Sequence, residues 1–213
     1  MQKTLLFKYH LPKPLEKERA IFTALENELG RNILPSVPEE KNEELSINII
    51  KKTFEKYGLK LKYCGYYEVD SNNPERTNPR PFNIGKGCAG IPIYKGVIGK
   101  AIRNFAESVY VPDVRALEML NPLGHVACDP TMAGAEIVIA LPYVNGELLD
   151  EEKRMTRMTL DLDIERKNPF SDQGAIKLEE VCLTYMKMIF PGPPKYLGIA
   201  GIHMPKKLEL QEH

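Results

Sequence analysis

Tryptophan is absent from this chain of 213 residues, and cysteine is scarce, with four positions. Four thiols over this length are too few for the disulfide-rich scaffolds of small secreted proteins. No two of them form a C-x-x-C pair, which argues against a structural zinc site. We therefore expect a protein without a bound metal and with reduced thiols. Cys64 and Cys182 lie within apolar patterns, so both are predicted to pack in the core.

A net charge is also lacking, because 29 basic side chains balance 29 acidic ones. The overall charge therefore gives no indication of binding to nucleic acid or to an anionic membrane surface. No apolar run approaches the length of about 18 residues that spans a bilayer. The N-terminal segment carries Lys8 and has no cleavage pattern typical of a secretory signal. A soluble, cytoplasmic, globular protein is the resulting expectation.

Apolar residues at helical spacing predict four helices. Glycine stops follow the first two helices at Gly30 and Gly58, and Ser171 is predicted to be the N-cap of the last helix. The predicted helical ranges are 15–29, 43–57, 97–105 and 171–191.

Runs of aliphatic and aromatic residues bounded by turn residues predict strands. Their ranges are 59–69, 91–94, 108–111, 136–144 and 154–164. Helices, then strands interrupted by short helices and long loops, then a closing helix fit an α+β domain better than repeating βαβ units. The predicted organisation is an N-terminal helical extension at 1–44, a central α+β domain at 45–190 and a Pro-rich C-terminal tail at 191–213.

The segment GHVACDP, residues 124–130, lies within a long connection between two predicted strands. Long loops in compact domains are often functional, and a loop cysteine is more accessible than a core cysteine. Cys128 lies beside Asp129 and three residues after His125. These residues leave two interpretations open: a reactive thiol, or a cysteine packed beneath its own turn with the histidine bonded to a backbone carbonyl.

A second cysteine, Cys88, lies in FNIGKGCAGIP, where Gly85, Gly87 and Gly90 permit a sharply turning backbone. The segment lacks the Gly-Lys-Ser/Thr ending of a P-loop, and a strand rather than a helix is predicted after it. Nucleotide binding is therefore a weak interpretation. A bendable backbone instead suits a thiol that moves to meet another thiol.

Carboxylates form a third candidate group. Asp161 and Asp163 alternate in TLDLDIE, so a strand places both on one face, and Glu136 opens another apolar strand. A solvated face is the ordinary explanation for such a pair. If Glu136 faces the same cavity, the three carboxylates instead predict a site for an amino group, in which one carboxyl with a raised pKa could act as a general acid.

Six segments of the chain match a known family pattern. They are KYCGYY (62–67), GKGCAGIPIYKGVIGKAI (85–102), VYVPDV (109–114), GHVACD (124–129), AEIVIAL (135–141) and LDLDIE followed by NPFSD (160–172). Together they resemble the GAF-domain free methionine-R-sulfoxide reductases. The GHxACD loop with an upstream glycine-flanked cysteine is characteristic of these reductases, whereas the other pieces occur across GAF domains. The resemblance implies a GAF-like domain with a central antiparallel sheet flanked by helices.

The resemblance also implies roles for single residues. Cys128 would be the nucleophile that attacks the sulfoxide sulfur, and Cys88 would convert the resulting sulfenic acid into a disulfide. Asp163 would also be catalytic, assisting protonation of the sulfoxide oxygen. The implied substrate-binding residues are Tyr63, Tyr67, Glu136, Asp161 and Asp163.

Two departures from the family bear on these roles. Ile98 stands where many members have a third cysteine in a GVCG motif, so only Cys88 is left as a resolving thiol. Tyr63 stands where the family has a tryptophan that forms part of an aromatic wall. This chain is thus similar to a subgroup variant without the third cysteine.

The resemblance implies an oxidoreductase that repairs oxidised free methionine. Its predicted partners are free methionine sulfoxide and an external thiol reductant, thioredoxin-like in the cell or dithiothreitol in an assay. No bound cofactor, nucleic acid or membrane is expected, and the two terminal extensions could support a homodimer. Two alternatives stay open: a non-catalytic GAF module that senses a small molecule, and a cysteine redox sensor without turnover.

Overall fold

The computed structural model describes residues 15–103, 108–116, 131, 133–141, 158–190 and 206–207. The helices within these ranges are α1 (Glu16–Asn32), α2 (Glu39–Lys56), α3 (Gly96–Arg103) and α5 (Asp172–Ile189). The strands are β1 (Leu61–Val69), β2 (Arg76–Ile84), β3 (Ile91–Pro92), β4 (Val109–Val111), β5 (Ala135–Leu141), β6 (Met158–Ile164) and β7 (Lys206–Lys207).

The strands form one sheet in the order β3-β2-β1-β6-β5-β4-β7. Neighbouring strands are antiparallel except for β4 and β7, which are parallel. Long β1, β6 and β5 occupy the middle of the sheet, so residues on these three strands can meet across it. The α+β class and the central antiparallel sheet flanked by helices are thereby confirmed.

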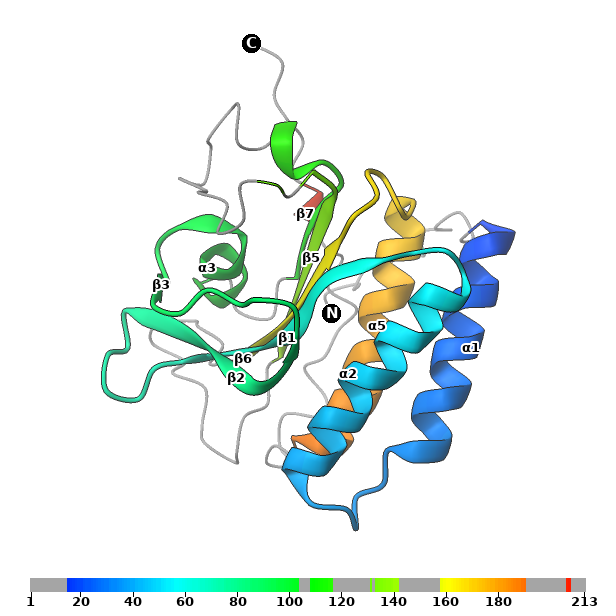
Figure 1. The fold of residues 1–213 in the computed structure, drawn as a ribbon, viewed down its shortest axis with the longest axis horizontal. Helices are drawn as coiled ribbons and strands as arrows, with labels where there is room; N and C mark the ends of the chain where they lie inside the picture. The colour runs from blue at the N-terminus through cyan, green and yellow to red at the C-terminus, as the bar shows by residue number, and fades with distance from the viewer. Residues whose placement is uncertain are drawn as a thin grey trace, which may run out of the picture.

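Helices cover the two faces of the sheet unequally. α1, α2 and α5 form a layer on one side, and the short α3 lies on the other (Figure 1). Side chains that alternate along β1 pack on opposite faces of the sheet. Cys64 and Tyr66 belong to the core under the helical layer. Tyr63 and Tyr67 belong to a smaller core beside α3. The face beside α3 is the one that carries the candidate site.

Two helix ends differ from the sequence prediction, and two agree with it. α1 continues through Gly30 to Asn32, so Gly30 is not a helix stop. α2 begins directly after Pro38, several residues earlier than predicted, and a proline is well tolerated at a helix start because no intrahelical bond to its nitrogen is required. Gly58 has a φ of 73° just beyond α2, as expected of a helix-terminating glycine. The hydroxyl of Ser171 caps α5 as predicted.

Strand β2 was missed because its sequence, RTNPRPFNI, contains two prolines. Proline has no N–H and normally argues against a strand. β3 pairs with β2 only at residues 76–77, so Pro79 and Pro81 lie beyond the paired part of that edge. Against β1, the register shifts between Gly65 and Tyr67, where more residues of β2 than of β1 are accommodated. The prolines thus lie at a bulge within β2, where ladder hydrogen bonds are already interrupted.

Arg80 projects from this bulge and ties β2 to α2 and β1. Its guanidinium donates hydrogen bonds to Glu43 at 2.9 Å, and to Glu39 and Glu68 at 3.1 Å each. The Glu43 side chain is fully buried. Burial raises the pKa of Glu43 to about 7, although Arg80 acts in the opposite direction. The buried carboxylate therefore depends on this arginine as its counter-ion.

Replacing Arg80 by methionine is expected to lower the free energy of unfolding by about 3–5 kcal/mol, because Glu43 is then left buried without its cation. The loss should grow as the pH rises above about 7, where the Glu43 carboxyl would have to ionise. Urea denaturation at pH 6 and pH 8.5 measures both effects. Lys60→Met is the control, since Lys60 pairs with Glu165 on the exposed surface and should lose less than about 1 kcal/mol. Equal losses of unfolding free energy in the two variants would contradict the role of Arg80 as the counter-ion of Glu43.

The predicted division at 1–44, 45–190 and 191–213 stays a prediction. α1 and α2 bury their apolar faces in the same core as the sheet and α5. Most of the predicted tail lies outside the described residues, apart from the two residues of β7. Within the described ranges, each helix is too short or too polar to cross a bilayer.

Candidate functional site

Glu136, Asp161 and Asp163 meet on the face of the sheet beside α3. In the antiparallel pair of β5 and β6, Glu136 lies opposite Asp163, and Val138 lies opposite Asp161. Because side chains alternate along a strand, the three carboxylates project to the same side as Val138, which belongs to the smaller core. One oxygen from each carboxyl group lies within 4.8 Å of the others. The sheet register therefore gathers the three predicted acidic residues into one cluster.

Two of the three carboxylates are buried, and the third, Asp163, is half-buried. Glu136 is 6% exposed and Asp161 is 4% exposed. Burial first, and the nearby Asp163 second, raise the pKa of both Glu136 and Asp161 well above the usual carboxyl range. The Oδ1 atom of Asp161 has no hydrogen-bond partner among the described residues. The solvated-face explanation is therefore wrong for this strand, and the cluster favours binding of a proton or of a cationic group.

Tyr63 and Tyr67 adjoin the carboxylates from β1. Tyr63 lies opposite Asp163 in the register of β1 and β6, and the two tyrosine rings pack with their centroids 5.6 Å apart. The Tyr63 hydroxyl is buried and has no hydrogen-bond partner within the described ranges. Burial, then Tyr67 and Asp161, raise the pKa of Tyr63. Its hydroxyl stays protonated at neutral pH and is available as a hydrogen-bond donor.

Thr159 belongs to the same face, although the sequence analysis did not single it out. It lies opposite Tyr67, two residues before Asp161 on β6. Its buried hydroxyl has no hydrogen-bond partner in the described part of the chain. A signal was present in the sequence, since the alternation in TLDLD puts the threonine in one row with Asp161 and Asp163.

Cys88 lies between β2 and β3, above β1. Its backbone N–H donates a hydrogen bond of 2.9 Å to the hydroxyl oxygen of Tyr67. Gly85, three residues earlier, has a φ of 83°, and a Cβ on it would lie 2.1 Å from the carbonyl oxygen of Lys62 on β1. Only glycine accommodates both the backbone angle and the close approach. This glycine therefore lets the Cys88 segment pack directly against β1.

The cysteines separate into two environments. Cys64 and Cys182 are free and buried, which confirms the prediction that they pack in the core. Burial raises the pKa of both thiols, that of Cys182 to about 12, so neither is reactive at neutral pH. Cys88, by contrast, is disulfide-bonded, so the expectation of reduced thiols does not hold at this position. Cys128 and the other residues of the predicted 124–130 loop lie outside the described residues.

The chemistry of this face favours an organic ligand that carries a positive charge. Three carboxylates could surround a hard divalent cation, but they equally accept hydrogen bonds from an ammonium group. The protonated hydroxyl of Tyr63 is a donor, which suits an oxygen atom of an organic ligand better than a metal ion. The buried carboxyl groups with raised pKa values are also able to supply a proton.

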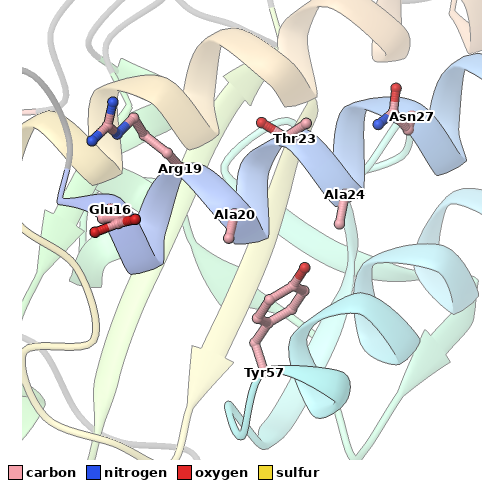
Figure 2. Close-up of a pocket in the computed structure, with 7 residues that line it drawn as sticks. All are labelled: Glu16, Arg19, Ala20, Thr23, Ala24, Asn27 and Tyr57. Carbon is pink, nitrogen blue, oxygen red and sulfur yellow. The ribbon is translucent and has the colours of Figure 1, made fainter.

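A separate groove lies on the helical layer. Figure 2 shows it along the outer side of α1, with the ring of Tyr57 directed toward that helix. The helical layer and the carboxylate cluster lie on opposite faces of the sheet. The groove therefore takes no part in the candidate site. It is lined by Glu16, Arg19, Ala20, Thr23, Ala24, Asn27 and Tyr57.

Comparison with models of known protein families gives no match, and a search of curated proteins finds no relative. Solved structures do match. One is a structure of a GAF domain, with a TM-score of 0.56 and 22% identity over 82% of this chain and 85% of that one. A free methionine-R-sulfoxide reductase from Neisseria meningitidis, in complex with its substrate, has a TM-score of 0.56 and 23% identity over 84% and 93%.

A third match is the GAF domain of a phosphoenolpyruvate-protein phosphotransferase from Acinetobacter. It has a TM-score of 0.53 and 12% identity over 88% of this chain and 98% of that one. Structures with the same fold thus include reductases as well as GAF domains of other proteins. The similarity of these structures over most of the chain, together with the largely antiparallel sheet and its flanking helices, establishes that the chain has the GAF-domain fold.

Proposed function

We propose that this protein reduces free methionine-R-sulfoxide to methionine by thiol and disulfide chemistry. The observation that carries the proposal is the gathering of Glu136, Asp161 and Asp163 beside two buried tyrosines, directly below the segment that bears Cys88. The fold of the Neisseria reductase is similar to that of this chain, which also supports it.

The proposed reaction has two chemical steps. The thiolate of Cys128 attacks the sulfoxide sulfur and the oxygen is transferred to Cys128, so that methionine leaves and a sulfenic acid remains. Asp163 assists protonation of the sulfoxide oxygen in this step. The thiol of Cys88 then attacks the sulfenic sulfur, an S–S bond forms, the S–O bond breaks and the oxygen leaves as water. The sulfoxide gains two electrons, and the two thiols lose them.

The state of the other cysteines supports the pairing of Cys88 with Cys128. Cys88 is disulfide-bonded, whereas Cys64 and Cys182 are free thiols buried under the helical layer. The proposal assigns Cys128 as the thiol that pairs with Cys88 in the oxidised enzyme. An external thiol reductant, thioredoxin-like or dithiothreitol, would then regenerate both thiols for the next turnover. The homodimer and the cytoplasmic location stay predictions.

Recognition of the free amino acid follows from the buried carboxylates. An α-ammonium group would neutralise the cluster and donate hydrogen bonds to oxygens such as the unpartnered Oδ1 of Asp161. A peptide or N-acetyl amide carries no such charge.

We therefore expect kcat/KM for N-acetylmethionine-R-sulfoxide to be lower than that for free methionine-R-sulfoxide by at least about 100-fold, the equivalent of one or two charge-assisted hydrogen bonds. Methionine or N-acetylmethionine release under dithiothreitol, followed by chromatography, measures the ratio. Equal rates for the two substrates would contradict the proposed ammonium contacts.

A second candidate function is a GAF module that binds a small molecule without catalysis. The similar fold of the Acinetobacter phosphotransferase GAF domain favours it, because that domain belongs to a protein of a different class. Such a module would bind its ligand without consuming thiols. The loss of two free thiols per methionine released separates the two functions.

A further inference from the structure

The segment that bears Cys88 is joined to the carboxylate face through one tyrosine. Tyr67 belongs to the face, where its ring packs on Tyr63, and its hydroxyl oxygen accepts the hydrogen bond from the backbone N–H of Cys88. Both tyrosine side chains are 3% exposed. Cys88 itself is half-buried, so the hydrogen bond is partly shielded from water, which makes it stronger than a fully exposed one.

The two ends of the segment are held independently of Tyr67. Gly85 packs against the backbone of β1, as described above. At the other end, the N–H of Gly90 donates to Oδ1 of Asn78 at 2.8 Å, and its carbonyl accepts a hydrogen bond from Arg76 at 2.7 Å. The strands thus fix where the segment begins and ends, while Tyr67 holds the backbone at the cysteine itself.

Tyr67 is suited to this task because it remains a neutral phenol. Burial, and secondarily Asp161, raise its pKa, whereas the hydrogen bond from Cys88 acts in the opposite direction. Its oxygen can therefore accept from the Cys88 amide while its proton stays in place. Phenylalanine would keep the ring and its contact with Tyr63, but would leave the amide of Cys88 without this acceptor.

We propose that Tyr67 is a positioning residue for the second chemical step, holding the backbone of Cys88 so that its thiol is presented to the sulfenic acid formed on Cys128. This inference rests on the part of the proposed function that makes Cys88 the resolving thiol. It does not depend on the identity of the sulfoxide. In the step concerned, the Cys88 sulfur bonds to the Cys128 sulfur, and the sulfenic oxygen leaves as water with the thiol proton.

The experiment forms the sulfenic acid with hydrogen peroxide instead of a sulfoxide. One equivalent of peroxide oxidises the Cys128 thiolate of the reduced full-length protein to sulfenic acid and is itself reduced to water. Samples quenched over time with dimedone and an alkylating reagent give, by mass spectrometry, the amounts of sulfenic acid and of disulfide. Wild type and Tyr67→Phe are compared, with Cys88→Ser as the reference in which no resolving thiol is present.

Tyr110→Phe is the matched control for loss of a buried phenol. Its hydroxyl donates to the backbone carbonyl of Phe170 at 2.9 Å, and it packs in the core under the helical layer, away from Cys88. We expect Tyr67→Phe to form sulfenic acid at the wild-type rate but to form the disulfide about tenfold more slowly, the effect of one hydrogen bond. Tyr110→Phe should form both at the wild-type rate.

Three results would overturn the inference: an unchanged rate of disulfide formation in Tyr67→Phe, an equal slowing in Tyr110→Phe, or a wild-type protein that forms no disulfide at Cys88. The proposed function fails in a different way. If peroxide gives the expected pattern but neither diastereomer of methionine sulfoxide yields methionine, the positioning role stands and the substrate is wrong.

Discussion

Serine in place of Cys128 is expected to lower the rate of methionine release from free methionine-R-sulfoxide by at least about a thousandfold. The proposed first step needs a thiolate, and a serine hydroxyl does not ionise at neutral pH and forms no stable bond of this kind with sulfur. Steady-state release of methionine under excess dithiothreitol, measured for wild type and Cys128→Ser at equal concentration, gives the ratio.

Cys88→Ser is the comparison that separates the two steps. It retains the proposed nucleophile, so reduced protein without external reductant should still release one methionine per chain and then carry a sulfenic acid. With a thioredoxin-type reductant, its recycling should be slow. Full activity of Cys88→Ser under that reductant would remove Cys88 from the mechanism, and substantial activity of Cys128→Ser would remove Cys128.

Asparagine in place of Asp161 is expected to lower kcat/KM for free methionine-R-sulfoxide by about 30- to 100-fold. The change keeps the size of the side chain but removes a carboxyl group that can ionise against a bound ammonium, and a lost charge-assisted hydrogen bond accounts for an effect of this size. Activity toward the N-acetyl substrate should change much less, because that substrate has no ammonium group. Glu179→Gln is the matched control, since Glu179 is also buried, with a pKa raised to about 7, but lies on α5.

The same Asp161→Asn variant should be more stable than wild type at neutral and alkaline pH. The pKa of Asp161 is raised in the folded state, so the folded protein binds its proton more tightly than the unfolded chain does. Stability is therefore lost as the pH rises above the usual carboxyl range, where the unfolded chain ionises freely. Asparagine removes this loss. Urea denaturation at pH 5 and pH 8 measures it, and a variant that is less stable than wild type at pH 8 would contradict the account.

Local patterns in the sequence were sufficient for most of the fold. Amphipathic spacing identified the helices, and the serine cap and glycine stop at Ser171 and Gly58 were placed correctly. Strand β2 was not found, because Pro79 and Pro81 are tolerated only through a register shift against β1. Such a shift is set by the pairing of β2 with β1, and the sequence of β2 alone does not show it. The prediction that Gly30 ends the first helix was wrong for a related reason, because a glycine inside a helix is tolerated when tertiary contacts hold that helix.

The candidate site was only partly predictable. Period two placed Asp161 and Asp163 on one face, but only the register of β5 against β6 shows that Glu136 lies opposite Asp163. Burial of the cluster could not be inferred from the strand, because alternating aspartates usually mark a solvated face. The contact between Tyr67 and Cys88 joins positions 21 residues apart, and no local pattern encodes it.

The most direct test of the proposed function is a single-turnover reaction without external reductant. Fully reduced protein is mixed with a stoichiometric amount of either the R or the S diastereomer of free methionine sulfoxide, and methionine and remaining thiols are counted. The account predicts one methionine per chain from the R diastereomer alone, with loss of the two thiols of Cys88 and Cys128. Release from neither diastereomer, or equal release from both, would contradict it.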